Sequence, residues 1–153
     1  QAVLNDPKVL ILDEPTAGLD PRERVRVKNL ISQMAQERIV LLATHVVSDI
    51  EQIGRELILM KDGRVLETGT PRELLASVKD KVYDLTVTGS ELEEVRKQYR
   101  VSSAAYHADR FLVHILSEEE PRKYLWQTGR PTLEDVYLDR FENGVNKDET
   151  VNK

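Results

Sequence analysis

The chain contains no cysteine, so disulfide bonds are excluded and an oxidising compartment is not required. Long apolar segments are also absent: the longest run, Ile39 to Ala43, has five residues, against the roughly 20 that span a bilayer. Basic residues do not predominate, since 22 Lys and Arg face 27 Asp and Glu. The formal charge of −5 argues against general nucleic-acid binding, for which a basic face is expected. The remaining composition, 40% hydrophobic and 32% charged, is typical of a globular protein.

The most informative pattern is an apolar run that ends in two adjacent carboxylates. Val9 to Leu12 is followed directly by Asp13 and Glu14. An unbroken apolar run of this length predicts a buried strand of a parallel sheet. Ligands of open α/β sheets bind at the carboxyl edge, so the two acids are expected where a ligand would lie.

A helix and a second strand follow this first strand. Apolar residues at helical spacing predict an amphipathic helix from about Pro21 to Gln36, with an inward face made of Val27, Leu30, Ile31 and Met34. Ile39 to Thr44 predicts another buried strand. A strand, helix and strand in this order predict parallel pairing with both carboxyl ends at one edge. We therefore expect Asp13, Glu14 and His45 within reach of one another.

The two carboxylates suit different parts of phosphate chemistry. A carboxylate at a strand end suits Mg²⁺, which is held by one or two carboxylates and keeps several waters. A second carboxylate can polarise an attacking water. Because Pro15 follows, Glu14 is expected to be extended and its side chain to point away from Asp13. A strand that merely ends in a polar turn explains Asp-Glu-Pro equally well when these three residues are taken alone.

The next segments alternate between helices and a hairpin. A short helix is predicted from about Val47 to Ile53, and strands Glu56 to Met60 and Arg64 to Glu67 flank an Asp-Gly turn. Thr70 and Glu73 form a capping box for the following helix. The character changes near residues 79–81, where we place a boundary between domains 1–79 and 80–142.

The second domain is predicted to be small and of α+β type. A strand at Tyr83 to Val87 precedes a helix that ends near Tyr99, with a capping box formed by Ser90 and Glu93. The following segments are a hairpin of Val101 to His107 and Phe111 to Leu116, a fourth strand within Arg122 to Gln127, and a helix from Thr132 with Leu133, Val136, Tyr137 and Phe141 facing inward. His107 and His114 are interpreted as ordinary sheet residues. Residues 143–153 have almost nothing to bury and are expected to be disordered.

The order and spacing of these residues resemble the ABC-type ATPases. Val9 to Asp20 resembles their Walker B motif and D-loop, and Ala43-Thr44-His45 resembles their switch histidine. The resemblance extends over about Gln1 to Ser77, and Pro131 to Tyr137 resembles a C-terminal signature of ATPases that drive ABC-2-type exporters. It implies an α/β fold in which the C-terminal part of a P-loop NTPase parallel sheet is followed by a small α+β accessory domain.

The resemblance also implies roles for individual residues. Asp13 would hold Mg²⁺ through water, Glu14 would be the general base, and His45 would contact the γ-phosphate. A lone histidine is otherwise more often structural. Asp20 would contact the partner subunit across a dimer, although it is also a good helix N-cap with Glu23 three residues later. Asp49 matches a frequent acidic position of the family, and a solvated helix face explains it equally well.

Several motifs of the family are missing from the sequence. No G-x-x-x-x-G-K-[ST] loop, which would cradle phosphates with backbone N–H groups and a lysine, occurs in the 153 residues. The Q-loop and the Leu-Ser-Gly-Gly-Gln signature are also missing. Gln1 to Leu4 resembles the last turn of a helix, so we expect the natural start to lie upstream. The chain alone is expected not to bind ATP tightly or hydrolyse it, and its sheet to leave an apolar face exposed.

The function implied is that of the ATP-hydrolysing subunit of an ABC transporter, with ATP and Mg²⁺ as cofactors. The expected partners are a membrane permease and a second ATPase subunit, in a homodimer or pseudo-dimer, without nucleic acid. The expected location is cytoplasmic and peripheral, on the inner face of the plasma membrane. Export is implied only by the C-terminal signature. Two alternatives remain: an ABC-fold ATPase acting on nucleic acid or the ribosome, and a non-catalytic interaction fragment.

Overall fold

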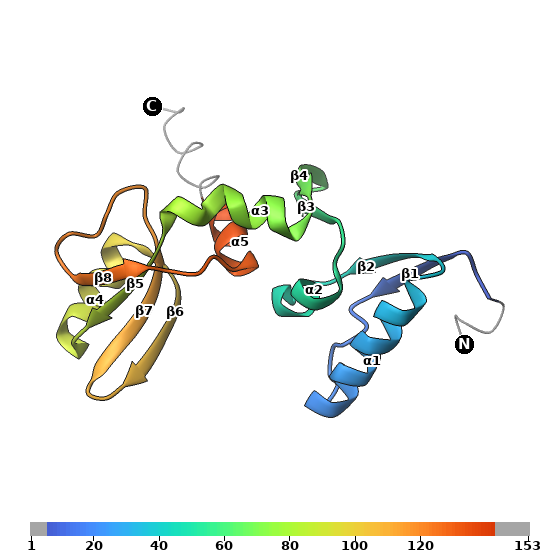
Figure 1. Ribbon diagram of the computed structural model, residues 1–153, viewed down its shortest axis with the longest axis horizontal. Coiled ribbons are helices and arrows are strands. Elements are labelled where there is room, and N and C mark those ends of the chain that lie inside the picture. The colour runs from blue at the N-terminus through green and yellow to red at the C-terminus, as the bar shows by residue number, and fades with distance from the viewer. Residues whose placement is uncertain (1–5, 143–153) are drawn as a thin grey trace. The chain divides into compact units, whose positions relative to one another are not determined.

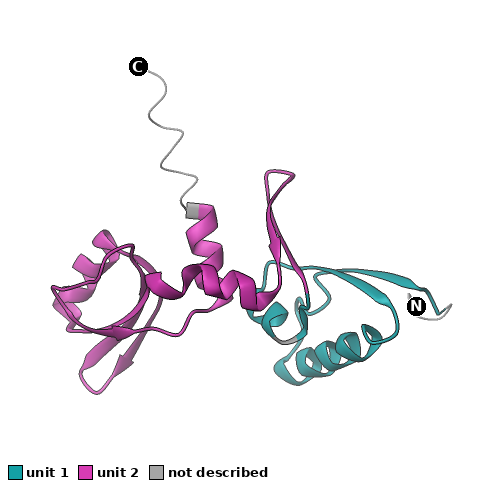
Figure 2. Cartoon of the chain, turned by 45° about the horizontal axis from the view of Figure 1, so that its top comes forward, with its two compact units in different colours: residues 1–55 teal, residues 56–153 magenta. Residues whose placement is uncertain are grey.

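The structure, a computed structural model, describes residues 6–142, apart from the side chains of Gln52 and Glu142. The chain forms two compact units, residues 1–55 and residues 56–153 (Figure 2). The sequence predicted domains that meet at residues 79 and 80, and that assignment stays a prediction. The helical turn predicted for Gln1 to Leu4 and the disorder predicted for residues 143–153 lie outside the described residues.

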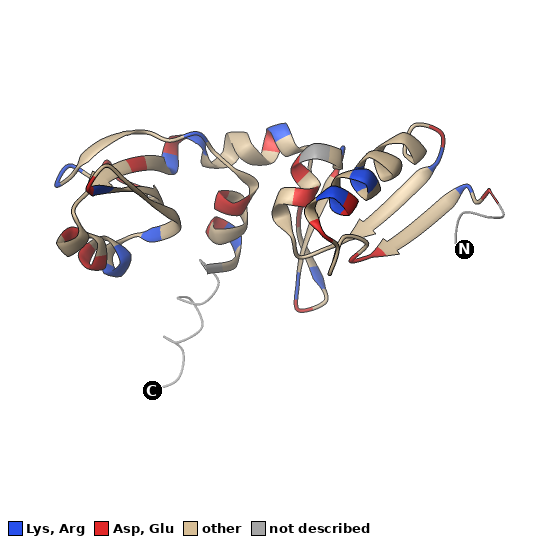
Figure 3. Cartoon of the chain, turned by 90° about the horizontal axis from the view of Figure 1, so that it is seen from below, with Lys and Arg blue, Asp and Glu red and all other residues tan. Residues whose placement is uncertain are grey.

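Over residues 6–55, the first unit is built from two strands and two helices (Figure 1). In chain order these are β1 (Val9–Asp13), α1 (Pro21–Met34), β2 (Ile39–Ala43) and α2 (Val47–Ile53). The two strands are parallel, as predicted, with Val9 opposite Ile39 and Asp13 opposite Ala43. Both strands are uncharged up to the last residue of β1, whereas α1 carries many charges (Figure 3). Because the strands are parallel and in register, their carboxyl ends lie side by side.

Burial in this unit agrees with the exposed apolar face expected for the sheet and differs from the sequence prediction on α1. Leu10 and Ile31 are buried, but Ile11 on the other face of β1 is 72% exposed. The strands are thus covered on one face only, and the exposed apolar side chains are Val9, Ile11, Ile39 and Leu41. On α1 the predicted inward residue Leu30 is 52% exposed, whereas Lys28 is buried. The prediction that Leu30 faces inward was wrong. The buried side of α1 includes Lys28 instead, whose amine pairs with the buried carboxylate of Asp49 on α2.

The second unit begins with an antiparallel hairpin of β3 (Leu57–Lys61) and β4 (Arg64–Gly69). Its turn has φ values of 51° at Asp62 and 73° at Gly63, as a tight Asp-Gly hairpin turn requires. The helix α3 (Pro71–Val78) follows and leads into the short 3₁₀ helix η1 (Lys79–Lys81). The predicted capping box is confirmed, because Thr70 and Glu73 bind each other's backbone amides.

A four-stranded antiparallel sheet and two helices form the second unit from residue 82 to residue 142. In chain order the elements are β5 (Val82–Val87), α4 (Gly89–Gln98), β6 (Arg100–His107), β7 (Arg110–Leu116), β8 (Leu125–Thr128) and α5 (Leu133–Glu142). The strands lie in the sheet in the order β6-β7-β5-β8. Alternate residues of β5 and β7 pack with Leu92 and Val95 of α4 in one core. Burying such side chains away from water stabilises this unit by about 2 kcal/mol for each residue.

Two local predictions in this unit were wrong. The capping box of α4 uses Thr88 and Glu91 rather than Ser90 and Glu93; the Thr88 amide donates to the Glu91 carboxylate at 2.7 Å. On α5, Leu133 and Val136 are buried as predicted, but Tyr137 is 46% exposed and stacks on Phe141. Within the described part of the chain, no helix combines the length and hydropathy that crossing a membrane requires.

Candidate functional site

Glu14 and His45, the residues that follow β1 and β2, are in direct contact. Parallel pairing continues past the strands, because the Glu14 amide donates to the Ala43 carbonyl at 2.9 Å. The His45 amide donates to Oε1 of Glu14 at 2.8 Å, and Nδ1 of the His45 ring lies 2.6 Å from the same oxygen. The predicted juxtaposition of these two residues is therefore present at the carboxyl edge of the strand pair.

The backbone of Glu14 is not extended, which corrects the expectation drawn from Pro15. Its φ is 44°, in the left-handed region that non-glycine residues rarely adopt. Contacts hold it there: its carbonyl accepts from the Ala17 amide at 3.1 Å, and Thr44 Oγ1 donates to its Oε2 at 2.9 Å. Such a conformation costs on the order of 1–3 kcal/mol and persists where surrounding contacts determine it.

The Glu14 carboxylate is the electrostatic focus of this edge. The hydrogen bond to His45 holds the pKa of Glu14 below its ordinary value, and bonds from the His45 amide and Thr44 act in the same direction. The Glu14 side chain is 30% exposed and that of His45 is 80% exposed. The ionised carboxylate can accept a proton from a bound water. The open imidazole beside it can donate a hydrogen bond to an anion.

Asp13 lies beside this pair in sequence and ends β1. It is exposed, and its carboxylate makes no hydrogen bond to any other described residue. Among residues 6–142, no group of three or more His, Cys, Asp and Glu could hold a metal ion. The single carboxylate of Asp13 fits a Mg²⁺ held through water, whose remaining ligands would be water and phosphate oxygens.

Asp20 caps α1 and is not joined to the Glu14–His45 contact. Its Oδ1 accepts from the Arg22 amide at 2.9 Å and from the Glu23 amide at 3.0 Å. The N-cap predicted from the sequence is confirmed. No hydrogen bond or ion pair between Asp20 and either Glu14 or His45 is present in the described structure.

A buried polar cluster behind the edge was not predicted. Asp49 of α2 is 2% exposed, so the interpretation as a solvated helix face was wrong. Thr16 Oγ1 donates to Asp49 Oδ2 at 2.5 Å, and Lys28 Nζ lies 3.4 Å from Oδ1. Burial raises the pKa of Asp49, but the bonds from Thr16 and Lys28 outweigh it and hold the pKa below its ordinary value. The sequence signal for this cluster was the match of Asp49 to a frequent acidic position of the family; nothing in the sequence indicated that Lys28 is buried with it.

A second ionic cluster lies in the four-stranded sheet, around His114 of β7. Its Nδ1 contacts the Asp84 carboxylate and its Nε2 lies 3.0 Å from Asp135 Oδ2 at the start of α5. The hydrogen bond to Asp135, with that to Asp84, raises the pKa of His114 to about 9 despite burial. Gly129 makes room for the ring, since a Cβ there would lie 2.9 Å from His114 Cε1. His114 is therefore not the ordinary sheet residue that the sequence suggested.

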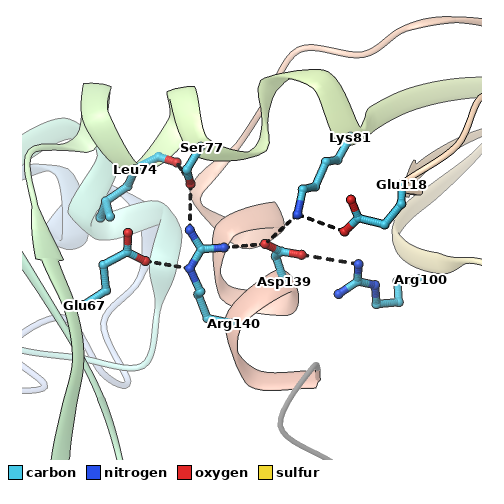
Figure 4. A network of polar contacts seen from close by, with 8 residues as sticks. All are labelled: Glu67, Leu74, Ser77, Lys81, Arg100, Glu118, Asp139 and Arg140. Carbon is cyan, nitrogen blue, oxygen red and sulfur yellow. Dashed lines mark hydrogen bonds and ion pairs between the residues drawn. The ribbon is translucent and has the colours of Figure 1, made fainter. Parts of the chain in front are cut away.

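A third network joins α5 to the hairpin and α3 (Figure 4). The side chain of Asp139 is 1% exposed and faces three cations, from Lys81, Arg100 and Arg140. Arg140 also binds Glu67 Oε2 of β4 at 2.6 Å and Ser77 of α3 at 2.9 Å. These contacts are of a structural kind, because they fix α5 against its neighbours.

Comparisons with known proteins identify relatives for most of the chain. An uncharacterized ABC transporter ATP-binding protein of Synechocystis sp. is 30% identical over 155 residues, covering 95% of this chain and 43% of the relative. The ABC transporter ATP-binding protein YxlF of Bacillus subtilis, also uncharacterized, is 30% identical over 90% of this chain and 51% of its own length. The energy-coupling factor transporter ATP-binding protein EcfA2 of Listeria monocytogenes is 43% identical over 82 residues, 52% of this chain and 28% of its own. No family model matches the sequence.

These relatives and the parallel strand pair place the chain in the α/β class of P-loop NTPase folds. Within that class the chain is a homologue of the ABC transporter ATP-binding proteins over most of its length. The chain spans about half the length of the first two relatives, 43% and 51%.

Proposed function

We propose that this chain supplies the metal-binding and water-activating side of the ATP site of an ABC transporter ATPase. The observation that carries the proposal is the contact between Glu14 and His45 at the edge where Asp13 ends β1. Kinship with ABC transporter ATP-binding proteins supports the same conclusion.

Each residue of this edge has a role that follows from its surroundings. Bound ATP with Mg²⁺ would supply the electrophilic γ-phosphorus and the charge that stabilises the transferring phosphoryl group. Asp13 would hold the hydrated metal. The Glu14 carboxylate, whose pKa is lowered, stays ionised at neutral pH and orients the attacking water as its general base. His45 would orient Glu14 through its backbone amide, and its exposed imidazole would contact the γ-phosphate.

The partners and location also belong to the proposal. We infer that the complete protein pairs with a second ATPase subunit through the segment at Asp20 and drives a membrane permease from the cytoplasmic face. The names of the relatives specify transport and ATP binding without a direction. Export is supported by the segment Pro131 to Tyr137 alone. The domains are proposed to be residues 1–79 for the ATPase part and 80–142 for the accessory part.

We further propose that the 153 residues do not act by themselves. Hydrolysis would require the phosphate-binding loop, whose backbone N–H groups and lysine hold the triphosphate and which is absent from this sequence. The exposed apolar side chains Ile11 and Leu41 are consistent with a sheet that gains cover from further chain.

The test compares the chain alone with a polypeptide in which a phosphate-binding loop and signature segment precede it. Calorimetric titration of the chain alone with Mg-ATP should give no saturable binding at micromolar concentrations, and phosphate release should be absent. The longer polypeptide should bind and hydrolyse ATP. Submicromolar affinity of the chain alone would contradict the proposal, as would a longer polypeptide that binds ATP and never hydrolyses it.

A further inference from the structure

A buried carboxylate on α2 binds the segment that follows Glu14. The Asp49 side chain is 3% exposed, and Thr16, which donates its hydroxyl to it, is 2% exposed. A carboxylate is expensive to bury unless it is paired and hydrogen-bonded. Here Lys28 Nζ, 3.4 Å away, supplies the opposite charge. Burying the Asp49 carboxylate therefore costs free energy, which its contacts with Thr16 and Lys28 must offset. The contact with Thr16 joins α2 to the segment that follows Glu14.

The same two segments are joined at two separate points. Thr16 lies two residues after Glu14, and Asp49 lies four residues after His45. The Glu14–His45 contact is exposed to solvent, whereas the Thr16–Asp49 bond is buried. Two points of attachment fix both the separation and the orientation of the segments. The buried bond is the more durable of the two, because water does not compete for its donor and acceptor.

The helix that carries Asp49 is short and has no side-chain cap. α2 has seven residues, fewer than the 12–15 or so that an isolated helix needs to be even marginal in water. Its N-cap is Val46, which provides no side-chain hydrogen bond to the first turn. The position of α2, and with it the position of His45 just before it, must therefore depend on tertiary contacts such as that of Asp49.

We propose that Thr16 and Asp49 form a positioning pair that sets the geometry between Glu14 and His45. The effect of this pair on catalysis rests on the proposed function. Its effect on the geometry between Glu14 and His45 does not, and can be measured on this chain by itself. Neither residue needs to touch ATP. Loss of the pair leaves both functional side chains present but lets the two segments move apart, which shortens the time that the general base spends in place.

Hydrogen exchange on the full 153-residue chain tests the positioning directly. The His45 amide, which donates to Glu14, should exchange about tenfold faster or more in Thr16→Val and in Asp49→Ala, each of which removes the Thr16–Asp49 bond. Thr16→Ser keeps the hydroxyl and should stay near the wild-type rate. Ile31→Val is the control for general loosening, because Ile31 is buried with the strands; it should accelerate the Ile39 amide of β2 together with that of His45.

The outcomes separate positioning from simple packing. Selective acceleration at His45, with the Ile39 amide unchanged, supports the proposal. Unchanged His45 exchange in both variants overturns it, and so does equal acceleration of the His45 and Ile39 amides, because that pattern indicates a merely structural role.

Turnover supplies the second readout, in the longer polypeptide that contains a phosphate-binding loop. Thr16→Val should lower kcat about tenfold while KM for ATP changes by less than about twofold, and Thr16→Ser should restore kcat. Unchanged kcat in Thr16→Val, in a protein whose Glu14→Gln variant is inactive, overturns the positioning role. If Glu14→Gln itself retains activity, the proposed function has failed, and the exchange measurement alone decides the positioning.

Discussion

The ring nitrogen Nδ1 of His45 lies 2.6 Å from Oε1 of Glu14, although 31 residues separate them in the sequence. The contact arises because β1 and β2 are parallel and in register, so that their carboxyl ends meet. Each residue is held by its own backbone contacts, and the pair forms the directly bonded part of the candidate site.

The first prediction concerns Asp20, for which capping and a dimer contact can be separated. Asp20→Ala removes the acceptor for the Arg22 and Glu23 amides and should lower the free energy of unfolding of α1 by about 1 kcal/mol. Asp20→Asn keeps the cap and should leave that stability nearly unchanged. Hydrogen exchange of the α1 amides measures both effects. Equal destabilisation by the two variants would contradict the capping role.

In the longer polypeptide, Asp20→Asn also tests the proposed contact between subunits. Because the cap is kept, a loss of ATP-dependent dimerisation in this variant is attributable to the contact and not to α1. Sedimentation with and without ATP is the measurement. Unchanged dimerisation would remove Asp20 from the proposed interface.

The second prediction is a pH dependence of stability that comes from His114. Its pKa is raised from 6.5 to about 9, chiefly by the hydrogen bond to Asp135 and also by Asp84. The folded state therefore holds a proton that the unfolded state releases above about pH 6.5. The stabilisation is complete below about pH 6.5 and is lost as pH rises through about 9. Its full size is on the order of 3 kcal/mol.

Urea unfolding at several pH values measures this contribution, with fluorescence of Trp126 as the probe. Trp126 is the single tryptophan and packs edge-on against Tyr83 in the second unit, so the signal reports on that unit. His114→Gln should abolish most of the fall in stability between about pH 6.5 and 9. His107→Gln, at an exposed histidine of the neighbouring strand, should keep it. Parallel pH profiles for wild type and His114→Gln would refute the assignment.

The third prediction concerns the network around Asp139 (Figure 4). Asp139→Asn removes a buried negative charge that faces three cations and should destabilise the second unit by about 3 kcal/mol or more. The matched control is Glu118→Gln, which removes a 65% exposed partner of Lys81 and should cost less than about 1 kcal/mol. The same Trp126 fluorescence unfolding compares the two. Similar decreases in the free energy of unfolding for both variants would contradict the prediction that the buried charge of Asp139 contributes more than an exposed one.

Sequence patterns predicted much of this architecture where the determinants are local. The Asp-Gly turn, the Thr70–Glu73 capping box and the Asp20 cap each depend on residues within a few positions. The parallel strand pair followed from apolar runs separated by a helix, and it led to the Glu14–His45 contact. Local rules and strand order were sufficient in these cases.

The features that escaped prediction depend on partners distant in the sequence. Lys28 is buried because of Asp49, 21 positions later, and His114 is protonated because of Asp84 and Asp135. Glu14 departs from the extended conformation favoured before proline because contacts from Ala43 and Thr44 hold it. In each case tertiary contacts outweigh a local preference, which composition and periodicity do not reveal.

The central claim is that Glu14 activates the water that attacks ATP, and one variant tests it most directly. In a polypeptide that joins this chain to a phosphate-binding loop, Glu14→Gln keeps the shape of the side chain and removes its basicity. Glu23→Gln, a partly exposed carboxylate on α1, is the control. Single-turnover hydrolysis and ATP binding are measured on the same preparation. We expect Glu14→Gln to bind ATP and to hydrolyse it at least about 100-fold more slowly, while Glu23→Gln behaves as wild type. Hydrolysis by Glu14→Gln at the wild-type rate would contradict the claim.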